Sequence, residues 1–184
     1  MKIIKQWVLP LVIIGIIPMA FAQEDIESHP GFVDFSSLTA IADSEPKVEI
    51  SLKAPLLNMV TNLIRAEDEQ AADFISKLLR VTVNVFDSAA VDVDEISESM
   101  EDVANSLEAE GWERVVRVRE QDHVDIYARL SSDGEFIHGL AIMVAAPEET
   151  VLVNIVGDIS GNDLAALGRR FDIDELSGLE MDVD

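Results

Sequence analysis

The second half of the chain alternates between apolar and polar residues in four short runs separated by turn-forming residues. The runs cover residues 112–120, 123–130, 135–145 and 150–159. A period of two predicts β-strands. The connections are tight, and Gly134, which follows Asp133, tolerates the positive φ of a hairpin turn. Strands joined by such short turns pair as antiparallel neighbours, so this half of the chain predicts an antiparallel meander.

Two further strands and several helices complete the predicted fold. Alternation predicts strands at 48–52 and 79–86, and apolar residues at helical spacing predict helices at 55–64 and 68–78. A strongly acidic helix is predicted next, and Gly111 marks its end. One face of this helix carries Val93, Ile96, Met100, Val103 and Leu107. A last helix is predicted to start at Ser160, where Ser160 and Asp163 resemble a capping box. We therefore expect an α+β fold: a single, mostly antiparallel sheet of about five to six strands with helices packed on one face, a two-layer sandwich.

The first 22 residues have the pattern of a secretory signal peptide. Two lysines precede an apolar run of 16 residues that contains two prolines, which is shorter than the roughly 20 residues of a spanning helix. Small residues at Ala20 and Ala22 predict cleavage between Ala22 and Gln23. We expect a periplasmic or secreted protein with no membrane span in the mature chain.

Beyond the leader, the sequence divides into three parts. Residues 23–46 are expected to be loosely ordered, although Phe32, Val33 and Phe35 could form a short edge strand or a hydrophobic latch. Residues 47–171 form the predicted α+β domain, and residues 172–184 form an acidic tail.

The charge of the chain limits its partners. With 36 acids against 13 bases the formal net charge is −23, which repels nucleic-acid phosphates and anionic lipids. The sequence has no cysteine, which excludes disulfides, thiol nucleophiles and zinc–thiolate sites.

We find no catalytic or cofactor motif in the sequence. The three histidines, His29, His123 and His138, are not paired at the spacing of helical metal ligands. Ser160 lies one residue too late for a G-x-S-x-G nucleophile, and helix capping explains it better. We predict a non-enzyme with no cofactor and no built metal site.

One concentration of basic residues is a candidate interaction face. Arg114, Arg117, Arg119 and Arg129 lie within one predicted hairpin in a chain with few bases. If the valines of this hairpin face the helices, an open sheet face carries Arg117, Arg119, Tyr127, Arg129, His138 and Asn154. Such a face suits an unknown protein partner or a small anionic ligand. The alternative is that these arginines pair across strands with Glu113, Glu120, Asp122 and Asp125.

Four stretches of the chain resemble a known bacterial family, DUF4252, a domain of unknown function. They read EPKVEISL at 45–52, EGWERVVR at 110–117, VLVNIVGDI at 151–159 and LGRRFD at 167–172. The resemblance implies an exported bacterial protein of similar layout and transfers no catalytic residue. Within the third stretch we interpret Asn154 as a strand-end polar group and Gly157 as part of a turn.

These observations favour a non-catalytic periplasmic or secreted protein that binds a partner or ligand through its open sheet face. Two alternatives stay open. One is a hydrolase that uses scattered carboxylates, and the other is an acidic structural or envelope stress-response protein without a specific ligand.

Overall fold

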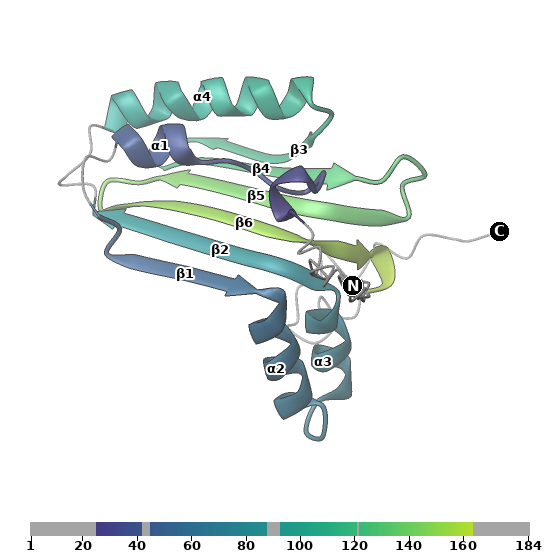
Figure 1. Ribbon diagram of the computed structural model, residues 1–184. Coiled ribbons are helices and arrows are strands. Elements are labelled where there is room, and N and C mark those ends of the chain that lie inside the picture. The colour runs from purple at the N-terminus through teal and green to yellow at the C-terminus, as the bar shows by residue number, and fades with distance from the viewer. Residues whose placement is uncertain (1–24, 42–44, 88–92, 121, 164–184) are drawn as a thin grey trace, which may run out of the picture.

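The computed structural model describes residues 25–41, 45–87, 93–120 and 122–163, which form one sheet with helices around it (Figure 1). All pairs of neighbouring strands are antiparallel, in the order β1-β2-β6-β5-β4-β3. The strands are β1 (Val48–Lys53), β2 (Leu78–Asp87), β3 (Glu113–Arg119), β4 (His123–Leu130), β5 (Phe136–Ala145) and β6 (Glu149–Ser160). The predicted α+β class with a single antiparallel sheet is confirmed.

Two groups of helices flank this sheet. The described helices are η1 (Ile26–Ser28), α1 (Ser36–Ile41), α2 (Ala54–Ile64), α3 (Glu69–Ser76) and α4 (Val93–Ala109). Helix α4 lies over β3, β4 and β5, with α1 beside it (Figure 1). The α2–α3 hairpin connects the end of β1 to the start of β2 and extends away from the sheet there (Figure 1).

The acidic helix α4 forms as its spacing predicts. Its buried side chains are Ile96, Met100, Ala104 and Leu107, which repeat at three and four residues. Gly111 ends it with a φ of 86°, which a residue with a Cβ rarely adopts. Glu101 and Glu108 of this helix contact arginines of β3, as described below.

The main core lies between α4 and one face of the sheet. The sheet contributes Phe86, Tyr127, Met143 and Leu152 to it. The segment before β1 contributes Val33, Phe35 and Leu38, all buried. Of the three residues considered for an edge strand or a hydrophobic latch, Val33 and Phe35 are buried in this core and Phe32 is half-buried.

A second, smaller core lies under the α2–α3 hairpin. Its buried members are Leu57, Leu78 and Ile159, with Leu52, Phe74, Ile75, Val81, Ile137 and Ile155 packed around them. Leu52, Val81 and Ile155 lie opposite one another in the strand register, on the side of the sheet away from α4. In the described part of the chain, the hairpin thus covers one end of that second face and leaves the edge residues Val48, Ile50, Val116 and Val118 exposed.

The end of β6 is fixed by a reciprocal cap. The Ser160 N–H donates to Asp163 Oδ2 at 2.9 Å and the Asp163 N–H donates to Ser160 Oγ at 3.3 Å, which are the two bonds of the predicted capping box. The remainder of the predicted last helix and the acidic tail lie outside the described residues, as does the predicted signal peptide.

Lys77 Nζ bonds the other oxygen of Asp163 at 2.5 Å. Burial raises the pKa of Asp163, but hydrogen bonds from Lys77 and Ser160 outweigh it and hold the pKa below its ordinary value.

Candidate functional site

The predicted basic face exists, but α4 covers part of it. Arg117 Nη2 lies 3.3 Å from Glu101 Oε1, and Arg114 Nη1 lies 3.2 Å from Glu108 Oε1. Both acids are on α4, so two acids of the helix pair with two arginines of strand β3. The arginines are therefore paired within the chain, through acids of α4 that the cross-strand alternative did not include.

Asp125 on β4 is the buried centre of this charged cluster. Its side chain is 0% exposed, and its Oδ2 lies 2.5 Å from Arg119 Nη2. Its Oδ1 lies 3.6 Å from Arg117 Nε. Of the cross-strand acids considered from the sequence, Asp125 is the one that these two arginines contact. A buried carboxylate needs such partners, so Arg117 and Arg119 are turned inward.

Tyr127 and Asn154 are not exposed. Tyr127 is 0% and Asn154 is 3% exposed, so the prediction that these two side chains are on an open face is wrong. The Tyr127 hydroxyl donates to Glu108 Oε1 at 3.0 Å. Burial, followed by this hydrogen bond, raises the pKa of Tyr127 above its ordinary value.

Arg129 has a structural contact at the end of α4. Its Nη1 donates to the Gly111 carbonyl at 2.5 Å. The carbonyls at a helix C-terminus carry partial negative charge, so a guanidinium there stabilises the end of the helix.

Asn154 holds the N-terminal segment on the sheet. It lies in the middle of β6 rather than at its end, and its Oδ1 accepts from the Val33 N–H at 3.1 Å. Its Nδ2 donates to the carbonyls of Gly31 at 3.0 Å and Leu140 at 3.2 Å. No local pattern indicates this clamp, because Asn154 and its main partners are more than 100 positions apart.

Two glycines, Gly139 in β5 and Gly157 in β6, allow the backbone of another segment to approach closely. A Cβ on Gly139 would lie 2.4 Å from the Gly31 carbonyl oxygen, so the N-terminal segment touches the β5 backbone directly. Gly157 lies inside β6 and not in a turn as interpreted from the sequence, and its Cβ would lie 2.4 Å from the Lys77 carbonyl oxygen.

His138 belongs to a small cluster beside this contact. Its Nδ1 lies 2.7 Å from Asp158 Oδ1, and its ring meets the His29 ring edge-on at a centroid distance of 5.7 Å. Donor atoms of the three residues lie within 4.8 Å of one another, a set that zinc or iron can use. However, His29 Nδ1 accepts from the Gly31 N–H at 3.1 Å, which places the proton of the neutral ring on Nε2. The edge-on contact of the two rings places the N-terminal segment against β5.

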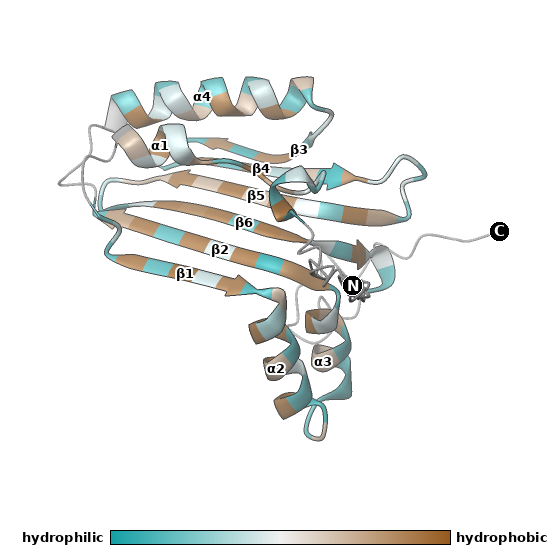
Figure 2. Ribbon diagram, viewed as in Figure 1, coloured by the Kyte–Doolittle hydropathy of each residue, from teal (hydrophilic) through white to brown (hydrophobic). Residues whose placement is uncertain are grey.

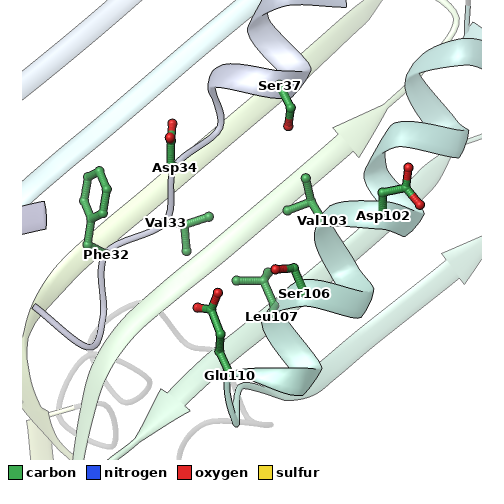
Figure 3. A pocket seen from close by; sticks show the side chains of 9 residues that line it. All are labelled: Phe32, Val33, Asp34, Ser37, Asp102, Val103, Ser106, Leu107 and Glu110. Carbon is green, nitrogen blue, oxygen red and sulfur yellow. The ribbon is translucent and has the colours of Figure 1, made fainter. Parts of the chain in front are cut away.

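A hollow lies between the N-terminal segment and α4 (Figure 3). Its volume is about 310 Å³. Val33, Val103 and Leu107 give it an apolar part, and Asp34, Asp102 and Glu110 are among its polar residues. This combination suits a cationic group on a short apolar stem. The sequence could not locate the hollow, because it depends on the docking of the N-terminal segment.

The opposite face of the sheet carries an unbroken apolar surface. Two rows of directly paired residues cross all six strands, and every position is valine or isoleucine. The rows are Val48-Val85-Val151-Val144-Val124-Val118 and Ile50-Val83-Val153-Ile142-Ile126-Val116, which together we name the valine–isoleucine face. Figure 2 shows how much of the length of the strands is apolar.

The valine–isoleucine face is accessible in the described structure. Val48 is 41%, Ile50 40%, and Val116 and Val118 each 37% exposed, at the two edges of the sheet. The other eight side chains are half-buried, and none is fully buried. A solvated face of an antiparallel sheet is normally polar. Here the arginines of β3 lie on the α4 side of the sheet together with the main core, and the expectation that Val116 and Val118 face the helices is wrong.

Within the described residues, no helix has the length and apolar character needed to cross a membrane. The fold and these surfaces define an α+β protein with one open sheet; in the described part of the chain, an acidic helix packs on one face and most of the other face is apolar and accessible. The chain belongs to the family described as Domain of unknown function (DUF4252), whose model matches residues 43–167. Neither a curated protein nor a solved structure matches it.

Proposed function

We propose that this protein is an exported, non-catalytic interaction protein that binds its partner through the valine–isoleucine face. The leader at residues 1–22 supports export to the periplasm or beyond the cell. The residues that sequence reasoning considered for chemistry have structural contacts: His138 with Asp158, and Ser160 with Asp163. These contacts support a structural role for those groups.

The size of the valine–isoleucine face carries the proposal. Its exposed fractions correspond to roughly 500 Å² of contiguous apolar surface, toward the upper end of the largest patch on an ordinary soluble monomer. Transfer of that area out of water is worth roughly 12 kcal/mol before the costs of association. An apolar surface of this extent favours contact with another macromolecular surface.

The partner differs in chemistry from the one expected from the sequence. An anionic ligand requires available guanidinium groups, but Arg114, Arg117 and Arg119 contact acids. The valine–isoleucine face carries no charged side chain. We therefore infer that the partner surface is apolar.

A retention experiment tests the proposed function. The variant combines Val83→Thr, Val85→Thr, Val151→Thr and Val153→Thr, which keep the β-branched shape while adding hydroxyls; we call it the four-threonine variant. The immobilised chain is exposed to periplasmic extract that also contains its own copies, and retained species are identified by mass spectrometry.

The expected result is an identified species that the parent chain retains and the four-threonine variant loses. The control is Val115→Thr, at a side chain that is 61% exposed and outside the two rows. Equal retention by the parent chain and the four-threonine variant would refute the interaction role. Export is tested separately by intact mass, which should show loss of residues 1–22 from the full chain.

A further inference from the structure

We infer that the partner on the valine–isoleucine face is a second copy of this chain, packed sheet against sheet; this inference rests on the proposed function. Three properties of the face point to a second copy: its width, its chemistry and its area.

The width of the face matches another sheet better than a helix or a peptide strand. Six strands at about 4.8 Å spacing make a surface roughly 25–29 Å wide. A helix about 10 Å in diameter covers two or three strands, as α4 does on the other face, and so leaves about half of this face exposed. Two sheets of equal width, in contrast, pack face to face at about 10 Å with their side chains interdigitated. A second copy supplies a sheet of the same width and side-chain spacing.

The chemistry of the face selects a partner like itself. The two rows present only β-branched hydrocarbon side chains, so no hydrogen-bonding or charged side chain specifies a polar partner. Valine and isoleucine have few rotamers, so little side-chain entropy is lost when they pack. In a dimer with a two-fold axis, the same surface of each copy forms the interface. Such two-fold dimers are the commonest form of oligomer.

The area is sufficient for a specific pair. Two copies would bury roughly 1,000 Å² from the twelve residues alone, which is the lower bound for a specific interface. Helix α2 extends the apolar surface of the protein with Leu56, Met59 and Leu63, which are 40%, 53% and 70% exposed. We therefore expect an affinity in the micromolar rather than the nanomolar range.

The charge of the chain gives the pair a distinctive salt dependence. Without residues 1–22, which contain Lys2 and Lys5 and no acid, each copy has 11 bases and 36 acids, a formal charge of −25, so two copies repel each other and salt screens that repulsion. Self-association should therefore tighten as salt increases. A partner attracted by opposite charge would show the reverse.

The test is the molar mass in solution, measured by light scattering and sedimentation equilibrium over a range of concentration. The sample is the chain without residues 1–22, which retains every described residue. We expect a reversible monomer–dimer equilibrium that strengthens with salt. The four-threonine variant should raise the dissociation constant at least about 100-fold, because eight buried methyl groups per dimer become unpartnered hydroxyls. Val115→Thr should leave it unchanged, and circular dichroism confirms that both variants fold.

Three results would overturn the inference that the partner is a second copy. A dimer that survives in the four-threonine variant has another interface. A monomer that binds a hydrophobic dye, with the dye lost in the four-threonine variant, leaves the face open to a different partner and the proposed function intact. A monomer whose face excludes the dye means that another part of the same chain covers it, and the proposed function then fails as well.

Discussion

The Asn154 side chain joins the N-terminal segment to the centre of the sheet, and its removal has a calculable effect. Asn154→Ala removes the acceptor of the buried Val33 N–H and the donor to the Gly31 and Leu140 carbonyls. A buried polar group left without a partner costs about 1–3 kcal/mol, and Val33 N–H and the Gly31 carbonyl are the two groups most affected. With the small cavity that remains, we expect about 3–5 kcal/mol of destabilisation.

Urea unfolding of the parent chain and the Asn154→Ala variant measures this difference, and amide exchange localises it. The Val33 amide should lose protection by a much larger factor than amides in β5 and β6 outside the contact, because the N-terminal segment detaches first. The matched control is Asn105→Ala on the exposed side of α4, which should change stability by less than about 0.5 kcal/mol. A loss below about 1 kcal/mol with unchanged Val33 protection would refute the clamp.

Three further predictions concern contacts inside the fold. Arg119→Met removes the closer partner of buried Asp125 and should cost about 3–5 kcal/mol in urea unfolding, whereas adding Asp125→Leu should recover part of that loss; no recovery would contradict the pairing. Gly139→Ala places a Cβ against the Gly31 backbone and should raise the exchange rate of amides in residues 31–35, while intact protection would mean that the two backbones do not touch. Asp163 has a folded-state pKa below its ordinary value, so its contribution to stability is present above about pH 4 and is lost as pH falls through the folded pKa; the stability difference from Asp163→Asn should shrink toward zero at low pH, and a constant difference would contradict it.

Much of the fold follows from local patterns in the sequence. The spacing of Ile96, Met100 and Leu107 defines α4, and Gly111 ends it as expected. The capping pair Ser160 and Asp163 also forms as predicted. These features depend on residues a few positions apart, whose geometry is fixed by the period of a helix or a turn.

The candidate site was harder to predict, because alternation shows which residues share a face but not which face is covered. Arg117 and Arg119 have the polarity of a solvated face, yet both contact buried Asp125. The acids of α4 that neutralise the basic strand lie on a different element. Val116 and Val118 have the polarity of a core and are among the more exposed valines of the sheet.

The long-range contacts were beyond local patterns altogether. Asn154 bonds a segment 121 residues away, and no feature within β6 indicates that partner. Likewise, the need for glycine at positions 31 and 139 becomes clear only from the structure, where the N-terminal segment lies against β5.

The central claim, that the valine–isoleucine face is the interaction surface, is tested most directly by methyl NMR of valine and isoleucine side chains. Spectra are compared between dilute and concentrated protein, at low and high salt. The account predicts shifts concentrated in the two rows, with Val83 and Val153 among the largest and residues on α4 unchanged. Shifts confined to other surfaces, or methyl groups of the two rows that contact the same chain at every concentration, would contradict it.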